Sequence, residues 1–213
     1  MKITEVKSLA IEDVKVVKFA RFQDNRGYFT EIFRKDDFFN NILMKESFQG
    51  FEILQQNESF SKPNVVRGLH FQWNPFMGKL VRTVRGRMVD LVLDIRKNSP
   101  TLGKIIMYDM PSSPDQESGE LIWVPPGFAH GNFFTEETII EYNCTGQYSP
   151  GCEAGISPIA DDLDWSLCDS VLKDAFDQIM VADFLMSEKD QLGFKLSDWL
   201  NDSRSDNFIY KQC

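Results

Sequence analysis

A series of β-rich segments fills the chain between Phe51 and Tyr148, and no helical pattern separates them. The segments are FEILQQNESF, VVRGLHFQ, KLVRTVRGRMVDLVLDIR, GKIIMYDM, ELIWVPPGFAHGNFF and TIIEYNCTGQY. Clusters rich in Gly, Pro, Asn and Ser, such as NSPTLG and MPSSPDQESG, lie between them and indicate turns. Parallel sheets need long crossovers that are usually helical, so this order favours an antiparallel sandwich or jelly roll over a βαβ sheet.

Helical patterns occur only outside this central region. The segment DDFFNNILM (36–44) has bulky residues at helical spacing and predicts one short helix. The segment CDSVLKDAFDQIMVADFL (168–185) predicts a longer helix with one apolar face, formed by Leu172, Phe176, Ile179 and Met180. We therefore expect a mainly β fold with a few peripheral helices, the longer ones C-terminal.

The length of 213 residues suits one main domain. We place that domain over residues 1–192. The remaining residues, 193–213, form a C-terminal extension, in which the polar stretch SDWLNDSRSDNFIYKQC predicts a peripheral helix with a loose end.

Charge and hydropathy exclude two classes of partner. The net charge of −9 gives no basic field for a nucleic-acid backbone, so a bound phosphate would need locally placed Arg and Lys. The chain shows neither a signal-peptide pattern nor an apolar run of 18 residues, so we expect no membrane partner and a cytoplasmic location. The four cysteines lack CxxC spacing and are expected to be reduced thiols: Cys144, Cys152, Cys168 and Cys213.

His70 lies in VVRGLHFQWNP, an apolar, strand-like stretch that also carries Arg67. One interpretation is a packed core histidine whose ring nitrogens are bonded to the backbone. However, Gln72 and the nearby Lys79 and Arg82 of GKLVR add polar groups to the same sheet, and burying them unpaired would be costly. A polar pocket lined by the sheet is the alternative that resolves this conflict.

A shared pocket for Arg67 and His70 needs an irregular strand. The two residues are three positions apart, so strict alternation would place them on opposite faces. A bulge or bend at Gly68, which lies between them, would bring both side chains to one face.

His130 lies in GELIWVPPGFAHGNFF, where Gly119, five further residues and then Pro-x-Gly-x-x-His fit most of the second sequence motif of cupin barrels. In metal-binding cupins the first motif supplies His-x-His and a glutamate, whereas the matching stretch here is HFQ. The chain has only two histidines, so an ordinary three-histidine metal site is impossible. We expect a cupin-type barrel without a catalytic metal.

Two further stretches carry candidate proton-transfer groups. Tyr142 and Tyr148, in EYNCTGQYSP, are six residues apart and would share one side of a regular strand. They are either packed tyrosines at a rim or include a catalytic proton donor. The charged segment MSEKDQ (186–191), taken alone, is typical of a solvated surface turn.

Taken together, these stretches resemble the dTDP-4-dehydrorhamnose 3,5-epimerases of deoxysugar-nucleotide biosynthesis. The resemblance covers residues 14–192 and rests on a series of motifs in order: DNRGYFTE, QQNESFSKPNVVRGLHFQ, GKLVR, GRMVDLVLDIRKNSPTLGK, WVPPGFAHG, EYNCTGQYSP and SEKD. It implies a jelly-roll barrel, a homodimer, no cofactor, and a nucleoside-diphosphate sugar as substrate.

The resemblance also implies roles for four residues. His70 corresponds to the general base that removes a proton from a carbon next to the 4-keto group of the sugar. Tyr142 corresponds to the acid that returns a proton from the opposite face. Asp190 of SEKD corresponds to the aspartate that orients this histidine, and Lys79 to the stabiliser of the enolate.

Further family positions contact the nucleotide sugar or its diphosphate. They correspond to Arg26, Glu31, Gln55, Asn57, Arg67, His130, Glu153 and Lys189. Because strands are exchanged between subunits in this family, residues near Arg26 would reach the neighbour's site. The cations Arg26, Arg67 and Lys189 could bind a diphosphate despite the net acidity of the chain.

The implied reaction inverts C3 and C5 of dTDP-4-dehydro-6-deoxy-D-glucose and yields dTDP-4-dehydro-L-rhamnose. Gln56 stands where the family commonly has Asp, so a GDP-linked sugar is one alternative. An epimerase acting at C3 or C5 alone, a sugar-nucleotide-binding cupin without catalysis, and a metal-dependent cupin isomerase or dioxygenase are the others. The linker over residues 165–187 and the tail after Leu192 are longer than is usual in the family.

Overall fold

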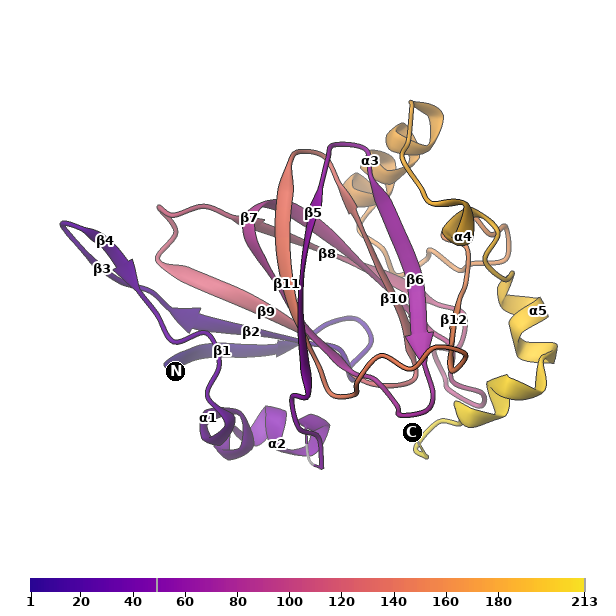
Figure 1. The fold of residues 1–213 in the computed structure, drawn as a ribbon, viewed down its shortest axis with the longest axis horizontal. Helices are drawn as coiled ribbons and strands as arrows, with labels where there is room; N and C mark the ends of the chain where they lie inside the picture. Colours follow the sequence, from indigo (N-terminus) through magenta and orange to yellow (C-terminus); the bar gives the residue numbers. More distant parts are fainter. Residues whose placement is uncertain (49, 213) are drawn as a thin grey trace.

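Antiparallel β-strands form the body of the protein in a computed structural model that describes residues 1–48 and 50–212 (Figure 1). In chain order the strands are β1 (Ile3–Ser8), β2 (Lys15–Ala20), β3 (Phe22–Asp24), β4 (Gly27–Phe29), β5 (Gln55–Ser61), β6 (Val66–Gln72), β7 (Lys79–Asp94), β8 (Ile105–Ser112), β9 (Ser118–Val124), β10 (Phe128–Phe134), β11 (Thr138–Cys144) and β12 (Glu153–Gly155). The segment ELIWVPPGFAHGNFF divides into two strands, β9 and β10, at its Pro-Pro-Gly turn.

The long strand β7 belongs to both layers of a sandwich. Its first half pairs with β9 and β11, and its second half pairs with β8 and β10. The layers are therefore β1–β2–β9–β7–β11–β5 and β8–β7–β10–β6–β12. The transition lies at Gly86, which has a φ of 93° and where a Cβ would lie 2.7 Å from the Thr138 hydroxyl. This arrangement confirms the predicted antiparallel jelly roll.

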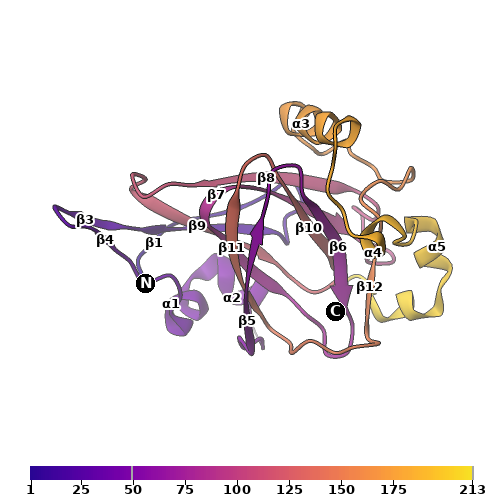
Figure 2. The same cartoon turned by 45° about the horizontal axis from the view of Figure 1, so that its top comes forward.

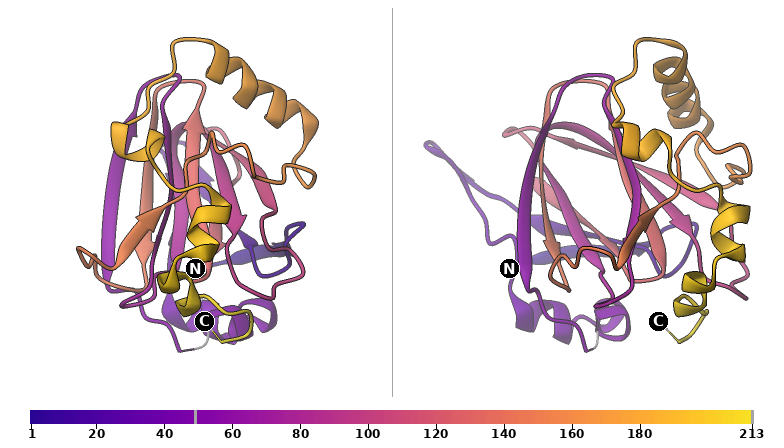
Figure 3. Two further views of the ribbon diagram at one scale, coloured as in Figure 1. Left: turned by 90° about the vertical axis from the view of Figure 1, so that its right-hand side faces the viewer. Right: turned by 45° about the vertical axis from the view of Figure 1, so that its right-hand side comes forward.

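The helices lie on two opposite sides of the sandwich (Figures 1 and 2). The N-terminal pair is α1 (Lys35–Asn40) and α2 (Ile42–Phe48). The C-terminal set is α3 (Ser170–Val181), α4 (Glu188–Gln191), α5 (Leu196–Asn201) and the 3₁₀ helix η1 (Ser203–Asn207). Figure 3 shows α3, α4 and α5 following one another along the same side.

The single helix predicted over residues 36–44 is wrong, because the structure has two short helices there. Asn41 interrupts them with an extended backbone, at φ −73° and ψ 122°. Its side-chain oxygen accepts a hydrogen bond from the Leu43 N–H at 3.0 Å, which competes with the helical pattern. The longer predicted helix is confirmed as α3, and Asp169 caps its first turn through the N–H groups of Val171 and Leu172.

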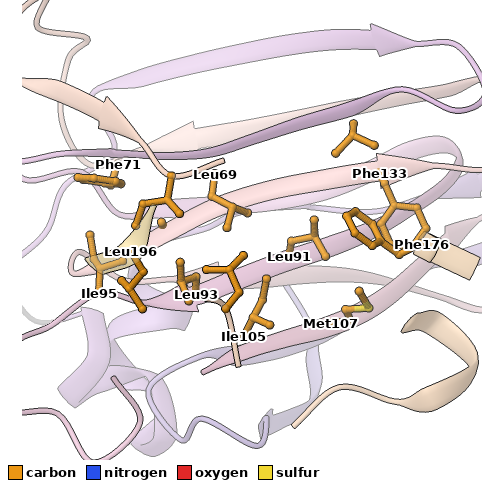
Figure 4. Close-up of a cluster of buried hydrophobic side chains, with 14 of the residues drawn as sticks. Leu69, Phe71, Leu91, Leu93, Ile95, Ile105, Met107, Phe133, Phe176 and Leu196 are labelled. Atoms are coloured by element: carbon orange, nitrogen blue, oxygen red, sulfur yellow. The ribbon is translucent and has the colours of Figure 1, made fainter. Parts of the chain in front are cut away.

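A large apolar cluster lies between the second layer and the C-terminal helices (Figure 4). Leu91 and Leu93 of β7 and Phe133 of β10 contribute from the sheet, while Phe176 of α3 and Leu196 of α5 contribute from the helices. Because side chains alternate along a strand, the neighbours of these residues face the interior of the sandwich. That interior face is the wall on which the candidate site is built.

Two further clusters complete the packing. Val92 and Ile122 belong to the cluster between the layers. Phe38 of α1 and Phe48 of α2 pack with Trp123 of β9 on the outer face of the first layer. The ring centroids of Phe48 and Trp123 are 4.5 Å apart. Helices therefore cover the outer face of each layer, and the part of the interior that the cluster with Val92 and Ile122 does not fill is left for a polar site.

The β3–β4 hairpin projects away from the body of the protein (Figure 1). Among the strands that the structure describes, these two pair only with each other. Phe22 and Phe29 on this hairpin are 51% and 69% exposed. Exposed aromatic residues on a projecting ribbon are typical of a contact surface for another molecule.

The segment after residue 192 is integrated with the sandwich. The expected helix is present as α5. Trp199 and Phe208 are fully buried in the apolar cluster on the outer face of the second layer. The ring centroids of Phe71 and Trp199 are 4.7 Å apart. Aromatic residues within a polar stretch therefore anchor the extension to the sheet.

Three cysteines are free thiols in the described part of the chain: Cys144, Cys152 and Cys168. Cys213 lies outside the described residues. Among the helices of residues 1–48 and 50–212, none combines the length and the apolar character that a membrane crossing requires.

We predict that Trp199→Ala lowers the free energy of unfolding by about 3–5 kcal/mol, because it leaves a cavity beside Phe71 and Phe208. Trp199→Phe keeps most of the packing and removes an indole N–H that has no partner among the described residues, so it should cost less. Leu192→Ala is the matched control, since that side chain is 76% exposed. Urea denaturation measures all three, and a loss below about 1 kcal/mol for Trp199→Ala would contradict the anchoring role.

Candidate active site

The pairing of β6 with β10 is irregular at the candidate site. His130 of β10 pairs with His70 of β6, but Asn132 pairs with Arg67. Two steps along β10 therefore correspond to three steps along β6, so β6 carries one extra residue in this interval. The side chains of Arg67 and His70 consequently lie on the same face of the sheet and line one cavity.

Glycines on both strands permit this bulge. Gly68 has a φ of 106°, and a Cβ at this position would lie 2.6 Å from the Cα of Gly131 on the facing strand. A larger residue at either position would force the strands apart. The bend predicted at Gly68 is confirmed.

His70 is paired with a carboxylate from a distant part of the chain. Its Nε2 lies 2.7 Å from Oδ1 of Asp190 in α4, and Oδ2 of Asp190 accepts a hydrogen bond from the Gly68 N–H at 3.2 Å. The Ser187 side chain caps α4 at the Asp190 N–H. Asp190 is therefore a buried member of the site, and the surface-turn interpretation of MSEKDQ does not hold at this position.

The environment keeps Asp190 ionised. Burial opposes the charged form, but hydrogen bonds from His70, Gly68 and Ser187 outweigh it and lower the pKa of Asp190 below its ordinary value. An ionised carboxylate orients the imidazole and stabilises its protonated form.

Lys79, at the start of β7, lies next to the same histidine. Its Nζ donates to the His70 carbonyl oxygen at 3.5 Å, and burial lowers the pKa of Lys79. The negative groups near it, including Asp90 and Glu153, oppose that shift. A half-buried lysine with a lowered pKa releases a proton more readily than an exposed one.

His130 forms a second pair with an aspartate. Its Nε2 lies 2.7 Å from Oδ1 of Asp90, and both side chains are buried. Burial lowers the pKa of His130, although Asp90 partly compensates, while Lys79 and His70 add to the lowering. His130 is therefore neutral near pH 7.

Tyr142 reaches the cavity from the other layer of the sandwich. It lies on β11, whereas His70 lies on β6, so the two side chains approach the cavity from different sheets. Burial raises the pKa of the Tyr142 hydroxyl, and Asn57 and Arg67 partly oppose the shift. The hydroxyl is therefore protonated and can act as a donor.

The regular strand predicted to carry both tyrosines ends before the second one. β11 stops at Cys144, and Tyr148 follows in an irregular segment. The Tyr148 hydroxyl donates to Glu153 Oε1 at 2.9 Å, and the Lys189 ammonium donates to the same oxygen at 2.7 Å. The tyrosines nevertheless line one hollow, because the chain turns back toward β12.

Two hollows meet at three of the predicted catalytic residues. The first has a volume of about 520 Å³. Of the site residues predicted from the sequence, those that line it are Arg67, His70, Lys79, His130, Tyr142, Lys189 and Asp190. The second has a volume of about 390 Å³. The predicted site residues that line it are Gln55, Asn57, His70, Lys79, Tyr142 and Glu153. The shared residues are His70, Lys79 and Tyr142, so the junction is the place where a substrate would meet all three.

Arg26 and Glu31 do not join this cavity within one chain. Arg26 lies at the turn of the β3–β4 hairpin, with its side chain 85% exposed and an ion pair to Asp24 at 2.6 Å. Glu31 pairs with Arg34 and with the amino group of Met1. A contact of either residue with substrate would require a second subunit.

Three residues of the site were missed from the sequence. Asp90 holds His130, Asn132 lines the first hollow, and Cys144 lines the second. The signal for Asp90 and Asn132 was an isolated polar residue within the apolar stretches VDLVL and GNFF, where a buried polar group needs a partner. Nothing in the pattern around Cys144 distinguishes it from a packed thiol.

The described part of the chain does not provide the grouped ligands that a metal ion needs. Among residues 1–48 and 50–212, no three His, Cys, Asp or Glu side chains are grouped so that they could hold a metal ion. The groups that converge at the junction are instead proton carriers and one cation. The fold and the site thus define a cupin-like jelly-roll protein equipped for acid–base chemistry on a polar ligand.

Comparison with known proteins identifies the family. The model of the family described as dTDP-4-dehydrorhamnose 3,5-epimerase matches residues 8–198. A relative of that name from Sinorhizobium fredii is 42% identical over 154 residues, which are 70% of this chain and 73% of the relative. The Escherichia coli relative is 34% identical over 191 residues, covering 88% of this chain and 92% of that protein.

Solved structures agree with this match. A dTDP-6-deoxy-D-glucose-3,5-epimerase from Legionella pneumophila, in complex with dTDP-4-keto-L-rhamnose, has a TM-score of 0.78 at 27% identity. The match covers 98% of this chain and 99% of that one. This chain belongs to the dTDP-4-dehydrorhamnose 3,5-epimerase family and is an isomerase of the epimerase type.

The buried, neutral His130 predicts a pH dependence of stability. The pKa of His130 in the folded protein lies below the ordinary value of 6.5. As the pH falls below 6.5, the histidine therefore takes up a proton in the unfolded chain before it does so in the folded protein. The free energy of unfolding should therefore fall below about pH 6.5, by at most about 1.4 kcal/mol per pH unit for this one proton. His130→Gln should flatten the slope between pH 6.5 and 5.5, and an unchanged slope in urea denaturation would contradict the assignment.

Proposed function

We propose that this chain inverts C3 and C5 of dTDP-4-dehydro-6-deoxy-D-glucose by removing and returning protons. The observation that carries the proposal is the junction of the two hollows, where a His70–Asp190 pair and Tyr142 reach the cavity from different layers beside Lys79. Inversion of a carbon needs a base on one face of the sugar and an acid on the other. The approach of His70 and Tyr142 from different layers supports these two roles.

In this proposal His70 is the base. Asp190 occupies Nε2, which leaves Nδ1 as the nitrogen that takes the proton from C3 or C5. The 4-keto group makes these protons removable, because the electron pair of the broken C–H bond moves into an enolate. The ionised Asp190 then stabilises the imidazolium, which supports catalysis of the order of a hundredfold to ten-thousandfold.

Lys79 stabilises the enolate oxygen. Its position next to His70 and its lowered pKa favour donation of a hydrogen bond or a proton to that oxygen. A preorganised donor at such an oxygen is worth about 3 kcal/mol of the barrier. Tyr142 then delivers a proton to the carbon from the opposite face, which completes the inversion.

The same proposal places the rest of the substrate along the two hollows. Gln55 and Asn57 are held to each other by a 3.0 Å hydrogen bond in the second hollow, and Glu153 holds Lys189 at its rim. Arg67 supplies a cation for the diphosphate in the first hollow. The reaction as written needs no cofactor, because side chains carry every proton.

A dTDP-linked substrate is favoured over a GDP-linked one by the position of Gln56. This residue replaces the usual Asp of the family, but it is exposed and its neighbours on β5, Gln55 and Asn57, face the hollow instead. The replacement therefore leaves the hollow of its own chain unchanged.

A homodimer in the cytoplasm is part of the proposal. The exposed aromatic residues of the β3–β4 hairpin and the distance of Arg26 from its own cavity support a hairpin that reaches into the site of a second copy. The free thiols of Cys144, Cys152 and Cys168 fit a reducing compartment.

Isotope exchange tests the reaction directly. In D₂O, wild-type protein should introduce deuterium at both C3 and C5 of the 4-keto sugar nucleotide, as followed by NMR. Deuterium at neither carbon would refute the proposed function, and deuterium at one carbon would identify an epimerase specific for that carbon.

His70→Asn and Asp190→Asn test the proposed base. His70→Asn should slow exchange by about a hundredfold to ten-thousandfold, and Asp190→Asn by about a hundredfold or more, because the imidazole loses its orienting anion. Asp183→Asn, on the same linker but exposed, is the matched control and should retain wild-type exchange. Retained exchange in His70→Asn would remove His70 from the base role.

Mixed dimers test whether Arg26 serves the partner subunit. Arg26→Ala and His70→Asn should each be impaired alone. A hybrid dimer would combine one intact His70 with the partner's intact Arg26, so random mixing should restore about a quarter of wild-type activity. If Arg26 acts within its own chain, co-expression of the two variants will restore nothing.

A further inference from the structure

Two rows of side chains face the first hollow from the β6–β10 pair. His70 lies opposite His130 in one row, and Arg67 lies opposite Asn132 in the next. The pairing of β10 with β7 is regular, so His130 and Asn132 face the same side and are about 7 Å apart along the strand. His70 and Arg67 have a role in the proposed function and His130 is paired with Asp90, whereas Asn132 has no such role and, among the described residues, no such partner.

Asn132 is a buried polar group that lacks a protein partner. Its side chain lines the hollow and is only 5% exposed. Among the residues that the structure describes, its carboxamide hydrogen-bonds neither a side chain nor the backbone. Because this carboxamide faces the hollow and has no protein partner there, it is available to hydrogen-bond a ligand in the hollow.

We infer that the Asn132 carboxamide hydrogen-bonds the C2 hydroxyl of the hexose and is a specificity-determining residue for the sugar. This inference rests on the proposed function, which places C3 at His70 and the diphosphate at Arg67. C2 lies between C3 and C1, and C1 carries the diphosphate. A sugar held by both rows therefore presents its C2 substituent near Asn132.

Asn132 and Arg67, the two groups of the second row, are chemically suited to different parts of the substrate. A carboxamide can donate and accept at once, which matches a hydroxyl group. The Arg67 guanidinium is already oriented by bonds to the Ser61 hydroxyl at 3.0 Å and the Phe60 carbonyl at 3.2 Å, and its charge suits the phosphate.

The apolar residues near Asn132 strengthen its preference for a sugar that carries a C2 hydroxyl. Val65, Ile140, Leu185 and Met186 line the same hollow and offer no hydrogen bonds through their side chains. A sugar without the C2 hydroxyl would leave the carboxamide unpaired among them. Sites built in this way reject the analogue that lacks the hydroxyl.

The test compares the substrate with its 2-deoxy analogue in two proteins. Asn132→Leu keeps a similar side-chain volume and removes both hydrogen-bonding groups. Wild type should use the 2-deoxy substrate about 10-fold less well in kcat/KM, followed as deuterium exchange at C5. Asn132→Leu should lose about 10-fold on the 2-hydroxy substrate and should no longer distinguish the two substrates.

Equal losses for Asn132→Leu on both substrates would overturn the inference. Calorimetric binding of dTDP should be unchanged in Asn132→Leu, and a parallel loss there would assign the carboxamide to the diphosphate and also overturn it. Asn143→Leu is the matched control, because Asn143 is half-buried on β11 and lines neither hollow. It should preserve the preference for the 2-hydroxy substrate.

The same design separates this inference from the proposed function. A wild-type protein that exchanges neither C3 nor C5 refutes the function. Calorimetry with the two sugar nucleotides still decides the role of Asn132, since an affinity difference in wild type that vanishes in Asn132→Leu supports the contact. Identical affinities in wild type refute it.

Discussion

The hydrogen bond from the Gly68 N–H to Asp190 Oδ2 joins the fold to the chemistry of this protein. It exists because β6 bulges at Gly68, and the bulge exists because Gly131 on the facing strand lets the backbones approach. The same carboxylate then binds His70 through its other oxygen. The bulge at Gly68 therefore brings Arg67 and His70 to the same face of the sheet. It also supplies the backbone N–H that binds Asp190, the aspartate that orients His70.

The fold was largely predictable because its local signals agree with its packing. Turn clusters and short apolar runs marked the strands, and α3 has both a capping aspartate and an apolar face. The failure at residues 36–44 arose from Asn41, since helical spacing continued through a residue whose side chain bonds the backbone instead. Trp199 and Phe208 were missed as core residues, because burial that depends on distant partners leaves no periodic signal in a polar segment.

The candidate site was predictable in its residue types but not in its geometry. His70 and Asp190 are 120 positions apart, and only the resemblance to a known family connected them before the structure did. Asp90 could have been found by the argument already applied to His70, since an aspartate in an apolar strand demands a buried partner. That partner, His130, became evident only when β10 was placed beside β7.

The two Asp–His pairs have the same 2.7 Å separation, yet their environments assign them different tasks. The His130 side chain is 7% exposed, and burial together with nearby Lys79 holds its pKa down. The His70 side chain is 36% exposed and lies at the junction of both hollows. In the proposed reaction, His70 would meet the substrate proton and carry the resulting charge beside the ionised Asp190. His130, which stays neutral, is suited to hydrogen-bond the sugar without competing for its proton.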